Sequence, residues 1–274
     1  MTYCHGQYQI LPMTVSSADP GDLFPMRGDL HSGLRLQLVV AHPDDETFGC
    51  GSLLLHAAAA GVVTAVCCGT RGEAGEWPED MVLPRGGIAE QREAELRAAA
   101  AALGVSQVDV LDFADSGMSG DAASTTLVGA EASAVSEAVR RTVSSFAPDV
   151  LVTLDGSDGH RDHVRVRAVT EQVGHELGLP VYVSCLSRTL MRQWAAWMTV
   201  QDPGSSYLAL GELGTPDEDV STRIDSGEHL AAREVAIALH RSQTSPFQGL
   251  PPDLRRAFLT TEYLMGPVPS TVRP

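Results

Sequence analysis

The sequence predicts an α/β fold in which an open, mostly parallel β-sheet carries helices on both faces. Two observations indicate it. Short apolar runs alternate with amphipathic segments of helical period, and the loops that follow two of these runs are dense in His and Asp. Strand–helix alternation builds βαβ units and therefore a parallel sheet. The length of 274 residues and a hydrophobic content of 43% suit one globular, Rossmann-like domain.

The individual elements follow from these patterns. Five segments are predicted strands. Four are short, mostly apolar runs: Leu36–Ala41, Val62–Cys68, Val150–Leu154 and Val181–Cys185. The fifth, Gln107–Phe113, alternates polar and apolar residues as a strand does. Five other segments are predicted helices: Gly49–Gly61, Ile88–Gly104, Ala134–Phe146, His163–Leu177 and Glu228–Ser242. In the helix Ile88–Gly104, for example, Leu96, Ala99 and Leu103 share one face, and Gly104 is a natural stop.

The ends of the chain are less regular. Residues 1–34 show no period and contain three prolines, which predicts an N-terminal extension packed on a single domain of residues 35–274. The segment Asp202–Asp219 is rich in turn-forming residues, and a proline-rich tail is expected after Ser242.

The charge balance excludes several classes of partner. Acidic residues outnumber basic ones, 35 against 19, and the net charge is −16. Nucleic acids and anionic membranes both require a basic surface, so neither is expected to bind. Every basic residue is arginine, which excludes a lysine Schiff base. No G-x-G-x-x-G follows the first strand, which argues against a dinucleotide-dependent oxidoreductase.

Cysteine usage and hydropathy indicate a cytoplasmic protein. The five cysteines are odd in number, contain no C-x-x-C and mostly lie in apolar stretches, as reduced and buried thiols do. No run of about 18 apolar residues could span a membrane. The N-terminus lacks the charged and apolar regions of a signal peptide.

The first candidate site follows the first predicted strand, in Ala41–Glu46 (AHPDDE). Ligands bind at the carboxyl ends of strands in parallel sheets. His42 and Asp45 lie three residues apart in a strand-to-helix turn, close enough to hold one ion, and Asp44 lies beside them, free to act as a base. The alternative interpretation is that Asp44 or Asp45 only caps the next helix.

The second candidate site follows the strand Val150–Leu154, in Asp155–His163 (DGSDGHRDH). It supplies His160, Asp162 and His163 at a helix N-terminus; here capping by Asp162 and two surface histidines are the alternative. Catalytic zinc takes three protein ligands from His, Asp or Glu. The two loops together therefore predict a three-ligand metal site that neither could form alone.

These residues resemble a known family. A-H-P-D-D-E after a first strand and G-H-x-D-H after a later one are similar to the LmbE-like, or PIG-L, zinc-dependent N-deacetylases, which act on N-acetylglucosamine conjugates. The resemblance extends from about Leu34 to about Leu264. Weaker supporting pieces are Thr70–Gly75, Arg92–Leu96, Asp115–Met118 and His240–Gln243.

The resemblance implies roles for individual residues. His42, Asp45 and His163 become the metal ligands, and Asp44 becomes the general base. His160 becomes the general acid or oxyanion stabiliser.

Three further expectations follow from it. Asp162 orients His160, and pairing with this carboxylate is expected to raise the pKa of His160. Arg92 and Asp115 fall on residues that hold the sugar in mycothiol-pathway relatives, although a solvated helix face and a turn are their structural alternatives. Arg161 stands where many members have proline and is expected to add positive charge at the mouth of the site.

The sequence thus predicts a zinc-dependent deacetylase acting on an N-acetylglucosamine-type sugar conjugate, a small-molecule substrate. Fe2+ is the alternative metal, since it accepts the same ligands. Two alternative functions remain: an amidase that cleaves a larger acyl group from glucosamine, and a non-catalytic sugar-binding member of the fold. The acceptor on the sugar, the oligomeric state and the role of residues 1–34 stay open.

Overall fold

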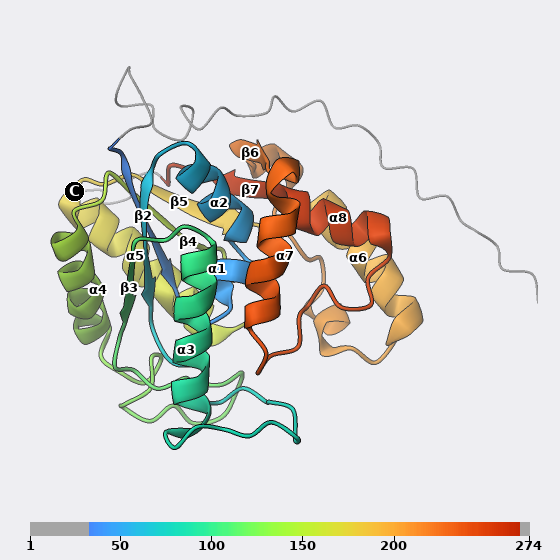
Figure 1. The fold of residues 1–274 in the computed structure, drawn as a ribbon, viewed down its shortest axis with the longest axis horizontal. Helices are drawn as coiled ribbons and strands as arrows, with labels where there is room; N and C mark the ends of the chain where they lie inside the picture. The colour runs from blue at the N-terminus through green and yellow to red at the C-terminus, as the bar shows by residue number, and fades with distance from the viewer. Residues whose placement is uncertain (1–32, 269–274) are drawn as a thin grey trace, which may run out of the picture.

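A computed structural model describes residues 33–268 (Figure 1). The predicted extension lies almost entirely outside the described residues. The strands are β1 Arg35–Val40, β2 Val63–Cys68, β3 Gln107–Val110, β4 Val150–Leu154, β5 Val181–Cys185, β6 Thr222–Asp225 and β7 Thr261–Met265. The α-helices are α1 Asp45–Phe48, α2 Gly51–Ala59, α3 Gly87–Ala102, α4 Ala132–Phe146, α5 Arg161–Leu177, α6 Arg188–Gln201, α7 Leu230–Leu239 and α8 Pro252–Thr260.

The described strands form one seven-stranded sheet in the order β3-β2-β1-β4-β5-β7-β6. The first five are parallel, and β7 runs antiparallel to both β5 and β6. The order reverses between β1 and β4, where Val39 lies opposite Thr153. Ligands of open α/β sheets bind at such a reversal, beyond the carboxyl ends of the strands. The prediction of an open, mostly parallel sheet is confirmed.

The side chains of β1 show why helices cover both faces. Leu36, Leu38 and Val40 belong to a core shared with α2, α3 and α7. Val39 and Ala41 point the other way, into a core shared with α4 and α5. Side chains alternate along a strand, so a mostly apolar run, here interrupted by the buried Gln37, indicates a strand buried on both faces.

The predicted helix Gly49–Gly61 is divided in the structure. A four-residue turn, α1, begins earlier, and α2 begins at Gly51. Gly49 lies between them because a Cβ atom there would meet Leu154 Cδ2 at 2.8 Å. The break lets the chain turn closely over the end of β4. The strand predicted over Gln107–Phe113 is also shorter and ends at Val110.

The C-terminal part differs most from the prediction. The proline-rich tail expected after Ser242 is wrong, because α8 and β7 lie there, and α6 and β6 were not predicted. Pro252 opens α8 at its first turn, a position that suits proline. In β7 the buried residue Glu262 is acidic and pairs with the buried Arg233 at 3.2 Å. Neighbouring residues in the sequence give no indication of this partner.

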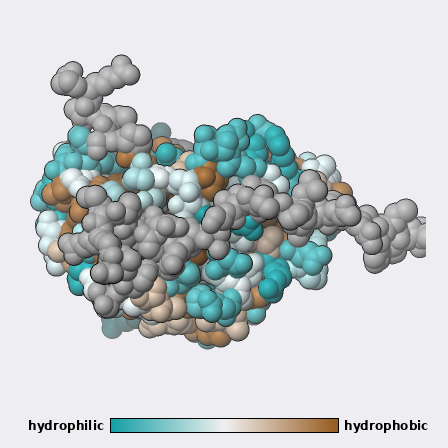
Figure 2. Space-filling view, turned by 90° about the horizontal axis from the view of Figure 1, so that it is seen from above, coloured by the Kyte–Doolittle hydropathy of each residue, from teal (hydrophilic) through white to brown (hydrophobic). Residues whose placement is uncertain are grey.

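Apolar side chains and thiols are buried in the described part of the chain. Trp194 and Trp197 pack against a third apolar cluster that includes Phe258. Four cysteines of the described part, Cys50, Cys67, Cys68 and Cys185, are free and buried. Among the described helices, none combines the length and apolarity needed to cross a membrane. Figure 2 shows hydrophilic and hydrophobic residues interspersed over the described part of one face.

Candidate active site

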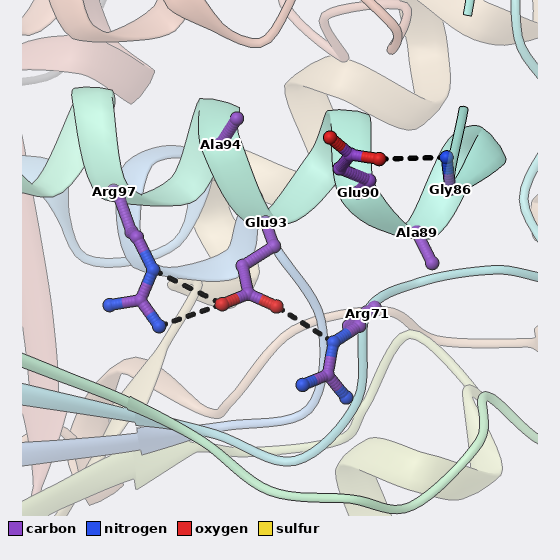
Figure 3. Close-up of a pocket in the computed structure, with 7 residues that line it drawn as sticks. All are labelled: Arg71, Gly86, Ala89, Glu90, Glu93, Ala94 and Arg97. Carbon is purple, nitrogen blue, oxygen red and sulfur yellow. Dashed lines mark hydrogen bonds and ion pairs between the residues drawn. The ribbon is translucent and has the colours of Figure 1, made fainter. Parts of the chain in front are cut away.

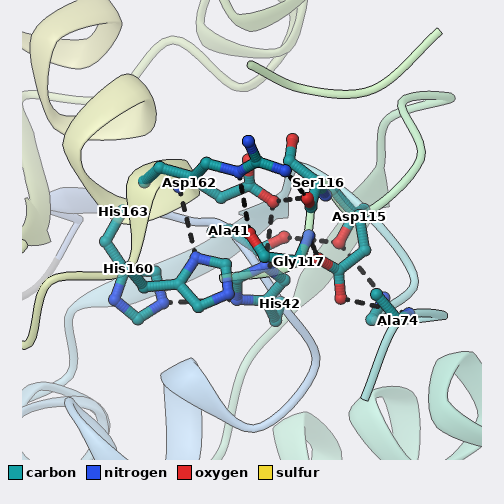
Figure 4. A network of polar contacts seen from close by, with 12 residues as sticks. Ala41, His42, Ala74, Asp115, Ser116, Gly117, His160, Asp162 and His163 are labelled. Carbon is teal, nitrogen blue, oxygen red and sulfur yellow. Dashed lines mark hydrogen bonds and ion pairs between the residues drawn. The ribbon is translucent and has the colours of Figure 1, made fainter. Parts of the chain in front are cut away.

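The two His- and Asp-rich loops meet at the reversal of strand order. One loop follows β1 and carries His42, Asp44 and Asp45, and the other follows β4 and leads into α5. Figure 4 shows the side chains of His42, His160, Asp162 and His163 gathered in one network. The structure therefore brings together loops that are more than 100 residues apart in the chain.

The three predicted metal ligands converge. His42 Nδ1 lies 3.2 Å from His163 Nε2, which lies 3.2 Å from Asp45 Oδ1. His42 Nδ1 is 3.8 Å from Asp45 Oδ2. Ligand atoms around tetrahedral zinc are about 3.3 Å apart when each bond is about 2.0 Å long. The donor set suits zinc, and both distances at His163 Nε2 match the spacing of ligand atoms around it.

Hydrogen bonds on the far side of each ligand fix which atom faces the centre. His42 Nε2 lies 3.2 Å from Asp162 Oδ2, and His163 Nδ1 lies 2.7 Å from Asp158 Oδ2. Asp45 Oδ2 accepts the backbone N–H groups of Ala41 and His42 at 3.1 and 2.8 Å. Carboxylate partners hold a ring proton on each outer nitrogen, so the inner nitrogens are the ones that release a proton when a metal ion binds.

The electrostatics of the cluster favour a cation as well. Burial lowers the pKa of His42, but the carboxylates of Asp115 and Asp162 outweigh burial and raise this pKa to about 10. Burial raises the pKa of Asp45, yet the rings of His163 and His42 hold it below its usual range. The carboxylates therefore stay ionised around the two histidines, which remain protonated until a metal ion displaces their protons.

Asp44 occupies a strained turn. Its φ of 123° is rare for a residue with a side chain, and strain of this kind costs about 1–3 kcal/mol. Its carbonyl accepts the N–H groups of Thr47 and Phe48 at 2.9 and 2.7 Å, but its side chain makes no capping hydrogen bond to α1. The capping alternative is thus not what the structure shows for this carboxylate. Burial and the neighbouring Asp45 raise the pKa of Asp44 to about 7.

Residues from the C-terminal part hold this turn. Glu46 Oε2 accepts the N–H of Asp44 at 3.0 Å, and Glu46 Oε1 lies 2.8 Å from His240 Nε2. Gln243 donates to the carbonyl of Pro43 at 2.8 Å. The prediction left Glu46 and Gln243 without a role. The only sequence signal was the segment His240–Gln243. The residues that it contacts, Pro43 and Glu46, lie about 200 positions earlier in the chain.

His160 differs from the expectation. Its Nδ1 accepts the backbone N–H of Asp162 at 3.2 Å, so the ring caps α5. The Asp162 carboxylate instead contacts His42 and accepts the N–H of Ser116 at 2.9 Å. The expected rise in the pKa of His160 is wrong: burial and the nearby His42 and His163 lower it. The ring lies edge-on to His42, with 4.4 Å between centroids.

The two predicted sugar contacts lie in different surroundings. Asp115 Oδ1 is 3.6 Å from His42 Nε2, at the edge of the cluster. Arg92 is 6% exposed and donates to the carbonyls of Gly72 and Glu76 at 2.6 and 3.0 Å. The structure therefore joins Asp115 to the site, whereas Arg92 holds the loop after β2.

Arg161 does not stand free at the mouth of the site. Its guanidinium donates to the carbonyls of Gly117 and Gly120 at 2.8 and 2.7 Å, to that of Ser119 at 3.2 Å and to that of Ser116. These residues form the loop that carries Asp115. The guanidinium keeps its positive charge and in addition holds this loop against α5.

Replacing Arg161 by Ala is expected to lower the free energy of unfolding by about 1–3 kcal/mol, because charged hydrogen bonds of this kind contribute about that much. Hydrogen exchange of the amides in residues 116–120 should accelerate. Arg165→Ala is the control, since Arg165 donates to the single carbonyl of Val128 at 2.6 Å. Equal rates of amide hydrogen exchange in the two variants would show that Arg161 does not hold the loop.

A surface pocket of about 500 Å3 lies away from this cluster (Figure 3). It is lined by Arg71, Gly86, Ala89, Glu90, Glu93, Ala94 and Arg97. Glu93 pairs with Arg71 and with Arg97, each at 2.7 Å. The charge of Glu93 is therefore paired with side chains that line the same pocket. None of the predicted site residues lines this pocket.

Comparison with known proteins gives a consistent result. Residues 37–173 match the PIG-L family, described as GlcNAc-PI de-N-acetylase. A relative in Catenulispora acidiphila is named 1D-myo-inositol 2-acetamido-2-deoxy-alpha-D-glucopyranoside deacetylase 2. It is 32% identical over 245 residues, which cover 76% of this chain and 79% of the relative.

Solved structures share the fold. A deacetylase of the teicoplanin biosynthesis pathway has a TM-score of 0.58 at 18% identity, covering 85% of this chain and 98% of that one. The 4-carboxy-2-hydroxymuconate hydratase of Pseudomonas putida KT2440 has a TM-score of 0.56 at 15% identity, covering 88% and 99%. The shared fold thus hosts two kinds of reaction, so reaction type must be argued from the site.

Proposed function

Because this chain belongs to the PIG-L family of GlcNAc-PI de-N-acetylases, we propose that it is a zinc-dependent hydrolase that removes the acetyl group from an N-acetylglucosamine-type sugar conjugate. The convergence of His42, Asp45 and His163 beside Asp44 is the observation that carries the proposal. A protein that only binds sugars has no need of a further carboxylate beside the three ligands. The substrate is a small molecule, and we place the reaction in the cytoplasm.

Zn2+ held by these three side chains would supply a Lewis acid that activates water and polarises the amide carbonyl. Asp44 takes the proton of the attacking water. A carboxylate with a pKa of about 7 suits this task, because a base works best when its pKa is near the working pH. The protonated Asp44 then donates to the nitrogen of the leaving amine.

His160 acts as a hydrogen-bond donor in this scheme. Its Nδ1 accepts the Asp162 N–H, so the proton of the neutral ring is on Nε2. The lowered pKa keeps the ring neutral at pH 7. A neutral imidazole N–H can stabilise the oxyanion that develops on the amide carbonyl, as a protonated ring would, without giving up its proton.

The sugar lies toward the loops after β2 and β3. Asp115 is ionised, since the nearby His42 outweighs burial and lowers its pKa, and its carboxylate can accept hydroxyl groups of a sugar. Arg92 acts on the substrate indirectly, by holding the loop Gly72–Glu76 in position.

The test is release of primary amine from a panel of N-acetylglucosamine conjugates, including the inositol conjugate, with larger N-acyl glucosamines alongside. The protein is assayed as purified, after chelation, and after addition of Zn2+ or Fe2+. We expect activity that is lost with chelator and restored by zinc. Amine from the larger acyl conjugates alone would favour the amidase, and bound zinc without any amine would favour a binding protein.

A further inference from the structure

We propose that Asp158 is a positioning residue that holds the ring of His163 with Nε2 directed at the metal. Neither the family motifs nor the predicted site residues include this carboxylate. The inference rests on the proposed function, because it requires that His42, Asp45 and His163 bind a metal ion.

The geometry of the loop after β4 supports this role. Asp158 Oδ2 lies 2.7 Å from His163 Nδ1, and Asp158 Oδ1 accepts the N–H of His160 at 3.0 Å. One carboxylate thus fixes both the ring and the backbone that leads into α5. The loop is shaped for it: Gly156 and Gly159 both have positive φ, 69° and 83°, on either side of Asp158.

The hydrogen bond matters because a histidine ring has two nearly equivalent orientations. Rotation about the bond that joins the ring to Cβ exchanges a nitrogen for a carbon on each side. Unprotonated Nε2 must face the centre, where it lies 3.2 Å from His42 Nδ1. A carboxylate that accepts from Nδ1–H selects both this orientation and this tautomer, and such partners are worth about 10- to 100-fold in metal affinity.

Asp158 is a better probe of this effect than Asp162, which contacts the other ring. The Asp162 side chain is fully buried, so truncating it would leave polar groups without partners inside the fold. The Asp158 side chain is 44% exposed, and water can replace it. A loss of metal affinity in an Asp158 variant can therefore be separated from a loss of folding, which thermal unfolding checks.

The experiment measures the zinc dissociation constant by competition with a chromogenic chelator. We expect Asp158→Ala to raise it by about 10- to 100-fold, and Asp158→Asn, which keeps an acceptor oxygen, to raise it less. Asp112→Ala is the charge-matched control, since that side chain is 95% exposed and pairs with Arg71 rather than with a ligand; its constant should stay within about twofold of the parent.

Each outcome decides between the two proposals. Equal affinity of Asp158→Ala and the parent chain overturns the positioning role and leaves the proposed function standing. An equal loss in Asp158→Ala and Asp112→Ala also overturns it, because the effect is then general charge. A parent chain that binds no zinc overturns the proposed function and this inference with it. As a second readout, imidazole 15N spectra of the zinc-loaded parent protein should show His163 protonated on Nδ1.

Discussion

Asp44→Asn is expected to lower kcat by about 10^2- to 10^4-fold while zinc content stays at the parent level. The amide has nearly the shape of the carboxylate but cannot take a proton from water, and general bases contribute about this much. Amine release and zinc per chain measure the two quantities. Retained turnover would show that another group is the base.

Asp44→Gly should be equally inactive yet more stable. Glycine adopts the φ of 123° without strain, and its greater freedom in the unfolded chain offsets only part of the gain. The net increase in unfolding free energy is about 1 kcal/mol, which corresponds to a few degrees in Tm. Since Asp44→Asn removes the charge and keeps the strain, the pair separates the two effects. A less stable Gly variant would refute the strain argument.

His42→Ala and His160→Ala should differ sharply, although the two rings are 4.4 Å apart. His42→Ala removes one of three proposed ligands, so we expect loss of zinc and of all turnover. His160→Ala removes only a hydrogen-bond donor to the oxyanion, so zinc should remain while kcat falls by about 10^2- to 10^3-fold. Zinc content after dialysis and kcat are measured together.

The control for this pair is His175→Ala, which removes an exposed histidine at the far end of α5 and leaves both site histidines in place. If His160→Ala lost its metal, His160 would be a ligand, as the grouping of His42, His160 and His163 nitrogens also permits. If His42→Ala kept its metal, the ligand assignment itself would be wrong.

The parallel part of the sheet could be predicted because each of its five strands is recognisable from its own short stretch of residues. Runs such as Val150–Leu154 are apolar on both faces, and each is bounded by turns. The convergence of the two motifs followed from the same rule, since loops after adjacent parallel strands lie at one edge.

The rest depends on contacts between distant residues. The strand β7 was not predicted because Glu262 is a charged residue at a buried position. Its burial depends on the ion pair with Arg233, which is distant in the sequence. His160 and Asp162 lie two positions apart, which suggested a side-chain pair, yet the Asp162 carboxylate contacts His42 instead. The contacts of Arg161 could not be predicted because its partners are backbone carbonyls, which every residue carries.

The anchoring of the Asp44 turn by His240 and Gln243 constrains how the protein matures during its synthesis. His42, Asp45 and His163 leave the ribosome well before Gln243 does, and the interval is on the order of seconds. Through that interval nothing donates to the carbonyl of Pro43 and nothing pairs with Glu46 as His240 does in the complete fold. A nascent chain can therefore bring the three proposed metal ligands together before the turn that carries the proposed base is held in place.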